Sequence, residues 1–222
     1  MKQREAELAL IQSVQDGLAS RMELLEIYDL VGDRIRDLFD AQITIIATFD
    51  LKSNTQYFNY YTDRAGREHL DPAPMSTLMQ KIARKKQTVV FNENVGAQMH
   101  KHGAKLIHGP LTPKSVLFVP FTGDELRGII SLQHMESENA FQQSDVDLLE
   151  TLASSLSAAL ENARLLNETR RLFQAEQQRV KELAVINALQ EALASKLDIP
   201  LIFEAVGDKL REIFNVQSVT IY

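Results

Sequence analysis

Three histidines in one stretch of the chain carry the side chains best suited to bind a metal. His100, His102 and His108 lie within residues 92–113. Imidazole nitrogens ligate zinc, nickel and haem iron, so these residues are weak candidates for a metal or haem site. Glycine and proline also interrupt the segment, which predicts a long irregular loop with its histidines in water. We favour the loop interpretation and assign no metal.

A second set of polar side chains could line a pocket for a small molecule. Alternate residues of a strand share one face, so a strand at 55–62 would place its odd-numbered residues together. A strand at 126–134 and the loop at 92–113 would add further polar groups. The pocket candidates are Tyr57, Asn59, Tyr61, Asn92, Asn94, His100, His102, Lys105, Ser131 and Gln133. Alternation does not say which face is buried, and a pocket filled by side chains remains the alternative.

The composition excludes several kinds of chemistry. The 222 residues contain no cysteine, which excludes disulfides, thiolate metal sites, cysteine nucleophiles and thioether-linked chromophores. We assign no catalytic residue, because no pair of nucleophile and base stands out. A net charge of −6 argues against nucleic-acid binding. No apolar run approaches the roughly 18–20 residues that span a bilayer, and the start of the chain is unlike a signal peptide. We therefore expect a cytoplasmic protein.

Periodicity predicts the elements that must position these residues. The order is helix, helix, two strands, short helix, short strand, long loop, strand hairpin and long helix. The predicted helices cover 4–20, 24–39, 71–85 and 143–196, and the predicted strands cover 43–50, 55–62, 88–91, 115–121 and 126–134.

The last helix is unusually long, because neither glycine nor proline occurs between Ile129 and Ile199. About 54 residues of helix span about 80 Å, which is more than a domain of this size can bury. Leu166, Phe173 and Val180 follow one another at seven-residue intervals, as in a coiled coil. The pattern favours a parallel homodimer through this helix, and a solvated spacer helix is the alternative.

Part of the chain is repeated. Residues 7–47 align without a gap with residues 182–222, at an offset of 175, and 16 of the 41 positions are identical. We interpret the chain as one complete domain followed by the opening of a second, truncated one. The expected boundaries are 1–160 for the first domain, 161–182 for a helical connector and 183–222 for the second copy.

The end of the first unit resembles the closing signature of GAF domains. Four segments carry the resemblance: the strand from Ser115 through Pro120, the strand beginning Arg127-Gly128, the run from Phe141 to Asp145, and the helix ending Glu161-Asn162-Ala163-Arg164-Leu165. The resemblance implies an α+β fold with a central antiparallel sheet of about five or six strands. The N- and C-terminal helices would cover one face. The short helix and the long loop would enclose a ligand pocket on the other face.

The resemblance also bears on ligands. The cyclic-nucleotide motif is incomplete, since Val146 stands where those relatives carry glutamate. Without cysteine, a covalent bilin and the chemistry of the free-methionine-sulfoxide reductase branch are both excluded. We expect a non-catalytic sensory module that binds an unknown small molecule and signals through its long helix to a histidine kinase, cyclase or phosphodiesterase. A ligand-free dimerisation spacer is the alternative.

Overall fold

The structure is a computed structural model, and it describes residues 24–104, 112–124, 126–194, 199–216 and 218–220. The helix expected at 4–20 and the candidates Lys105 and His108 lie outside these described residues. The chain forms two compact units, Met1–Arg164 and Leu165–Tyr222. Within the described part, no helix is both long enough and apolar enough to cross a membrane.

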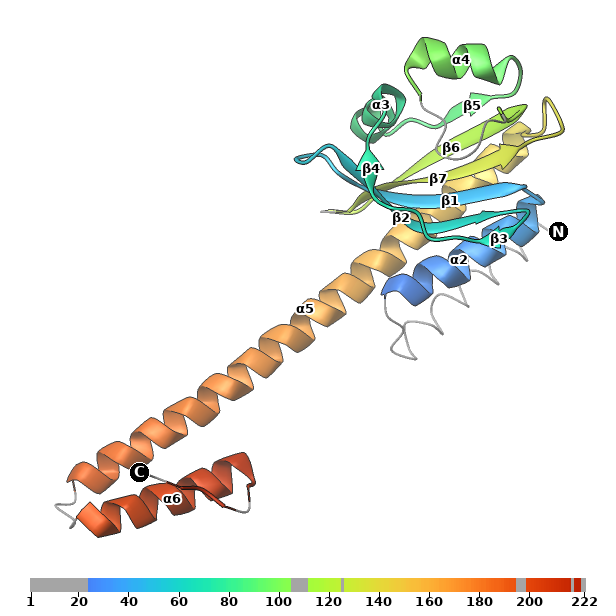
Figure 1. The fold of residues 1–222 in the computed structure, drawn as a ribbon. Helices are drawn as coiled ribbons and strands as arrows, with labels where there is room; N and C mark the ends of the chain where they lie inside the picture. The colour runs from blue at the N-terminus through green and yellow to red at the C-terminus, as the bar shows by residue number, and fades with distance from the viewer. Residues whose placement is uncertain (1–23, 105–111, 125, 195–198, 217, 221–222) are drawn as a thin grey trace. The chain divides into compact units, whose positions relative to one another are not determined.

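The first unit is built on one antiparallel sheet (Figure 1). The strands lie in the order β3 (Gly66–Arg67), β2 (Thr55–Asp63), β1 (Ile43–Asp50), β7 (Arg127–His134), β6 (Ser115–Thr122) and β5 (Val89–Phe91), and β4 (Ala73–Pro74) also pairs with β2. This confirms the expected α+β fold. The sheet has 7 strands instead of five or six, because β3 and β4 have 2 residues each and leave no periodic pattern in the sequence.

Helix α2 (Leu24–Phe39) and the first part of α5 (Gln143–Ala194) cover one face of the sheet (Figure 1). Residues at helical spacing face the strands and form the α2/α5 cluster. Its members include Ile35, Ile46, Leu117, Ile130, Leu132, Leu149, Leu152, Leu156 and Leu160. Full burial of each such side chain contributes about 1.5–3 kcal/mol, so burial in this cluster stabilises the domain.

Helices α3 (Thr77–Lys85) and α4 (Val95–His102) lie on the opposite face (Figure 1). The helix expected to begin at Asp71-Pro72 begins instead at Thr77. Ser76 is its N-cap, with Oγ accepting from the Met79 amide at 3.3 Å. A serine cap satisfies an unpaired amide, whereas Pro74 suits the short strand β4 at the sheet edge.

Helix α4 replaces the part of the predicted irregular loop at 92–113 that lies between Val95 and His102. Val95 and Met99 are four residues apart and both are buried, which stabilises the helix against the sheet. Gly96 lies inside the helix and does not break it. Gly103 ends the helix with a φ of 67°, a left-handed conformation that glycine adopts without strain.

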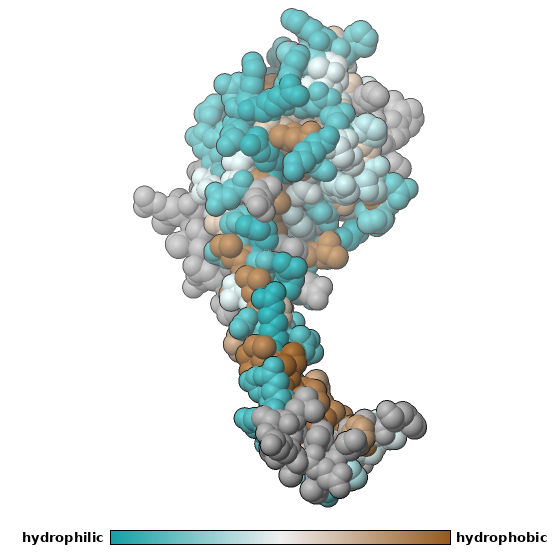
Figure 2. All heavy atoms as spheres, turned by 90° about the vertical axis from the view of Figure 1, so that its left-hand side faces the viewer, coloured by the Kyte–Doolittle hydropathy of each residue, from teal (hydrophilic) through white to brown (hydrophobic). Residues whose placement is uncertain are grey.

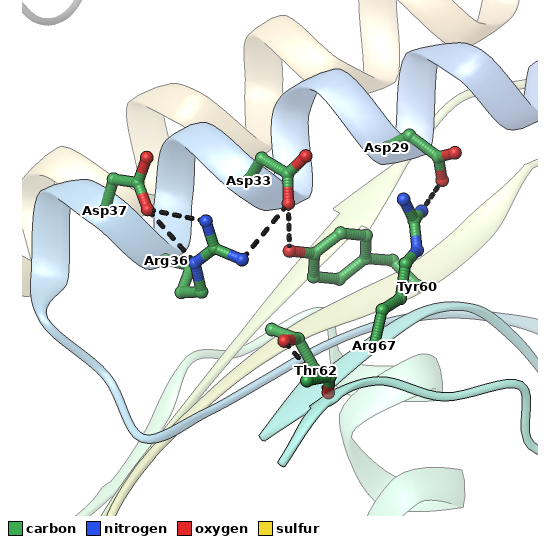
Figure 3. A network of polar contacts seen from close by, with 8 residues as sticks. Asp29, Asp33, Arg36, Asp37, Tyr60, Thr62 and Arg67 are labelled. Carbon is green, nitrogen blue, oxygen red and sulfur yellow. Dashed lines mark hydrogen bonds and ion pairs between the residues drawn. The ribbon is translucent and has the colours of Figure 1, made fainter. Parts of the chain in front are cut away.

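A polar network attaches α2 to the strands beside it (Figure 3). The Tyr60 hydroxyl donates to Asp33 Oδ1 at 2.8 Å, and Arg67 lies over the Tyr60 ring at 4.9 Å while it pairs with Asp29. Gly32 makes room for the ring, since a Cβ at this position would lie 2.4 Å from it. The network thereby holds α2 in register with β2 and β3.

The second unit contains the rest of α5, from Leu165, and helix α6 (Ile199–Phe214). Helix α6 begins and ends 175 residues after α2, in agreement with the repeat. The ion pair of Arg211 with Asp208 matches that of Arg36 with Asp33 in α2.

Large hydrophobic side chains stay exposed along α5 after Arg164. Figure 2 shows them as brown patches between hydrophilic residues. They are Leu165, Leu166, Leu172, Phe173, Val180, Leu183, Ile186 and Leu189.

Candidate functional site

The face of the sheet under α3 and α4 is the candidate site. Apolar side chains from both helices and five strands meet there and form the α3/α4 cluster. It consists of Ile45, Ala47, Phe49, Phe58, Tyr61, Met75, Leu78, Met79, Ile82, Ala83, Phe91, Val95, Met99, Val116, Phe118 and Ile129. Three of these residues are methionines, whose flexible side chains adapt to a changing shape.

Ser131 places a buried hydroxyl on this apolar face. Its neighbours across the sheet are Ile45 on β1 and Phe118 on β6, both members of the α3/α4 cluster. Ser131 is 3% exposed, and its Oγ has no hydrogen-bond partner among the described residues. A buried hydroxyl without a partner costs about 1–3 kcal/mol, which a polar ligand atom at this point would recover.

The aromatic strand does not place its candidates as expected. Asn59 is an extra residue of β2, so that Phe58 and Tyr60 occupy successive pairing positions opposite β1. This bulge interrupts the alternation of faces. Tyr61 therefore joins Phe58 in the α3/α4 cluster, while Tyr60 belongs to the α2/α5 cluster. The expectation that Tyr57, Asn59 and Tyr61 share one face is wrong.

Of these three candidates, Tyr61 alone belongs to the candidate site. Tyr57 is 42% exposed, and the Asn59 amide donates to Thr48 Oγ1 at 2.9 Å. The Tyr61 hydroxyl lies 3.4 Å from Asp63 Oδ2. Burial, with a further contribution from the Asp63 carboxylate, raises the pKa of Tyr61 to about 12. The phenol is therefore neutral at physiological pH and acts as a hydrogen-bond donor.

The two asparagines and Gln133 lie around the site in different ways. The Asn92 amide donates to the Phe141 carbonyl at 2.7 Å and accepts from the Phe141 amide at 3.3 Å, so it connects the end of β5 to the segment before α5. Asn94 is exposed at the N-cap of α4. Gln133 is half-buried near the end of β7 and pairs with Ile43 and Val116. Asn92 therefore has a structural role.

His100 and His102 do not converge on a common point. They lie on α4, where residues two apart point in directions about 200° apart. His100 is exposed, and the His102 ring stacks on Phe91 at 5.5 Å. In the part of the chain that the structure describes, no three histidine, cysteine or carboxylate residues are grouped to hold a metal ion. His108 lies outside that part.

A family model for the GAF domain matches residues 22–161, which is more than half of the chain. The chain belongs to the GAF domain family. GAF domains are sensory and regulatory modules of signalling proteins. The match covers the whole sheet and the part of α5 that packs on it.

Solved structures share this fold at low sequence identity. A GAF domain of an Acinetobacter phosphoenolpyruvate-protein phosphotransferase has a TM-score of 0.58 and 16% identity, over 74% of this chain and 95% of that one. Free methionine-R-sulfoxide reductase from Neisseria meningitidis, in complex with its substrate, has a TM-score of 0.60 and 17% identity, over 74% of this chain and 91% of that one. The phycoerythrobilin-bound GAF domain of a cyanobacterial phytochrome has a TM-score of 0.56 and 14% identity, over 72% of this chain and 97% of that one. A sequence search of curated proteins finds no match.

Sequence reasoning missed the methionines of this GAF domain's candidate site. Met75, Met79 and Met99 all belong to the α3/α4 cluster. Met99 lies in the segment that was expected to be an irregular loop, and Met75 precedes helix α3. The spacing of Val95 and Met99 was the one local signal that could have placed α4.

Proposed function

We propose that this chain is a non-catalytic sensory module that takes a small molecule on the α3/α4 face and passes its state on through α5. The alternation of β7 is the observation that carries this proposal. Ile129 and Ser131 face α3 and α4, whereas Ile130 and Leu132 are fully buried against the α2/α5 cluster. Because protein interiors are close-packed, a shift of β7 caused by a ligand would displace the side chains of α5 that pack on it.

The composition of the face indicates the ligand. A molecule among the residues of the α3/α4 cluster must be largely apolar, with one polar group positioned to bond Ser131 Oγ. The methionine side chains would move to admit it. Such a ligand changes the output only by the difference between its affinities for the two states of the domain.

The exposed stripe of α5 supports self-association. Leu166, Phe173 and Val180 are 48%, 64% and 57% exposed and recur every seven residues. Pairing with the same helix of a second chain would bury them in a parallel coiled coil. We infer a cytoplasmic homodimer with a GAF domain at 1–160, a connector at 161–182 and the opening of a second copy at 183–222. Its output domain would be a histidine kinase, cyclase or phosphodiesterase.

A ligand-free dimerisation spacer is the second candidate function. The observation in its favour is that apolar side chains from both layers already pack together on the α3/α4 face. In that case Ser131 would keep its unpaired hydroxyl, and α5 would set only the spacing and pairing of two chains.

Native mass spectrometry of the freshly purified chain, compared with its denatured mass, separates these functions. A dimer with excess mass that disappears on denaturation supports the sensor, and Ser131→Val should reduce the occupancy. A dimer of bare polypeptide mass that gains no mass after incubation with a cell metabolite extract favours the spacer. A bare monomer would contradict the dimeric relay.

The stripe itself can be tested with a matched pair of variants. Phe173→Glu with Val180→Glu places two charges on it and should give a monomer by analytical ultracentrifugation. Gln174→Glu with Ala175→Glu adds the same charge beside the stripe and should stay dimeric. Equal behaviour of the two variants would exclude this pairing surface.

A further inference from the structure

Charge is distributed unevenly along this chain. Residues 72–123, which include α3, β5, α4 and β6, contain seven lysines and arginines but only one acidic residue, Glu93, and so have a net charge of +6. The whole chain has a net charge of −6, so the other residues together carry −12. A charge asymmetry of this kind between parts of one chain indicates a surface for an anionic partner.

The fold places most of these cations on the outer side of α3. The buried residues of this helix face the sheet, whereas Lys81, Arg84 and Lys85 are exposed. Successive residues of a helix turn by about 100°, so these three side chains fall within an arc of about 100° on the side away from the sheet. Lys86 follows at the C-cap and is also exposed. Four cations therefore point outward from one short helix and its cap.

The helix dipoles explain only part of this charge. Arg84 and Lys85 lie in the last turn of α3, and Lys101 lies exposed in the last turn of α4, where cations interact favourably with the dipole. Lys81 lies in the middle of α3 and gains nothing in this way. The described residues supply no carboxylate that pairs with any of these cations. The basic face, as we name it, consists of Lys81, Arg84, Lys85, Lys86 and Lys101.

The side chains of the basic face indicate which kind of anionic partner it fits. Among the described residues, the exposed large hydrophobic side chains lie elsewhere, and none is on α3 or α4. A protein partner would need an apolar core in the interface, and a single-stranded nucleic acid would need aromatic side chains for its bases. Lysines and arginines on the outer side of an amphipathic helix are instead the arrangement that attracts anionic lipid headgroups.

The negative charge of the whole chain does not prevent such a contact. Exposed acids such as Asp37 on α2 and Asp147 on α5 lie on the opposite side of the sheet (Figure 1). Two helix layers and the sheet separate the two outer surfaces by roughly 20 Å or more. The Debye length is about 8 Å at physiological ionic strength, so these acids are largely screened from a membrane that meets the basic face.

We propose that the basic face docks on a membrane surface that contains anionic phospholipids, by electrostatic contact and without insertion. The ammonium and guanidinium groups of its side chains would bind headgroup phosphates. This contact uses the outer sides of α3 and α4, whereas the proposed sensory function uses the sides that face the sheet. The membrane contact therefore does not depend on a ligand of the α3/α4 cluster.

Co-sedimentation of the whole chain with vesicles tests this proposal. Vesicles of equal parts phosphatidylcholine and phosphatidylglycerol should bind the chain at low ionic strength, and vesicles of phosphatidylcholine alone should not. Salt at about 1 M should release the chain, because it shortens the Debye length to about 3 Å. Each cation near an anionic surface strengthens binding about fivefold, so Lys81→Gln with Lys85→Gln should weaken it about 25-fold.

A matched control removes the same charge from exposed positions on other elements. Arg34→Gln on α2 with Lys181→Gln on α5 should bind the vesicles as wild type does. Ser131→Val alters a residue that faces the sheet side of α3 and α4 and should also bind normally, so failure of the sensory function would be seen separately. Equal weakening by the two double variants, or no binding of wild type to the anionic vesicles at low ionic strength, would overturn the proposal. Binding of poly-glutamate without binding of the vesicles would also overturn it, since the partner would then be an acidic protein.

Discussion

Gly128 shows how closely neighbouring strands approach in this sheet. A Cβ on Gly128 would lie 2.2 Å from Phe121 Cζ and 2.5 Å from the carbonyl oxygen of Ala47. The phenyl ring can shift, but the carbonyl belongs to the backbone of β1. We therefore expect Gly128→Ala to lower the free energy of unfolding by about 1–3 kcal/mol, measured by denaturant titration.

Gly96→Ala is the control, because the nearest atom to its Cβ, Thr112 Cγ2, is 3.4 Å away. Gly96 lies in a helix, where alanine is favoured by up to about 1 kcal/mol. This variant should be as stable as wild type or slightly more stable. Equal stability of the two alanine variants would mean that β7 and β1 are not so closely packed.

Buried tyrosines make the domain sensitive to alkaline pH. Burial raises the pKa of Tyr61 from 10.0 to about 12, and burial also raises the pKa values of Tyr28 and Tyr60. A phenol with a raised pKa in the folded state favours folding fully below its unfolded pKa. That contribution is lost as the pH rises toward the folded pKa.

The free energy of unfolding should therefore fall between pH 10.0 and about 12. Tyr61→Phe cannot ionise at this position and should show a shallower fall, measured by urea titration at several pH values. A fall of the same slope in wild type and Tyr61→Phe would show that Tyr61 does not contribute to it.

At the scale of elements, α5 has two parts with different environments. Leu156 is fully buried in the α2/α5 cluster, whereas Leu172 is 57% exposed on the same helix. Leu156→Ala should cost about 2–5 kcal/mol of unfolding free energy. Leu172→Ala should change it by less than about 0.5 kcal/mol at concentrations where the chain is monomeric. Similar losses for both variants would contradict this division of the helix.

Long regular elements could be predicted from sequence almost to the residue. The observed bounds of α2 and β1 match the predicted ones, because their apolar residues recur with one clear period and turns follow them. Helix α4 was missed because Gly96 and Gly103 were both interpreted as breaks. Gly96 is inside the helix, and Gly103 alone ends it. Local composition did not reveal that burial on the sheet outweighs a glycine in the first turn of the helix.

The candidate site could be predicted as a face of the sheet but not residue by residue. Ser131 was identified and lies on that face, because β7 alternates without interruption. The prediction failed on β2, where the bulge at Asn59 separates Tyr61 from Tyr57. A bulge depends on how two strands pair, and the sequence of one strand does not record it.

At the scale of the whole molecule, protection against hydrogen exchange should differ between the two units. Between Leu149 and Ala163 one face of α5 is buried, whereas after Arg164 its large hydrophobic side chains are exposed. Exchange of the amides in the first segment should require unfolding of the domain, and the amides of the second segment should exchange faster by local opening. Mass spectrometry of the monomeric chain measures both. Uniform protection along α5 would contradict this expectation.

The continuity of α5 constrains how its length can change. Each residue inserted after Arg164 advances the rest of the helix by about 1.5 Å and rotates it by about 100°. An insertion of seven residues makes nearly two full turns and returns the apolar stripe close to its original direction. An insertion of two residues rotates the stripe to the opposite side of the helix. Viable insertions and deletions in this connector are therefore expected to have lengths that complete nearly whole turns, such as seven or eleven residues, so the helix would vary in length while keeping its angular phase.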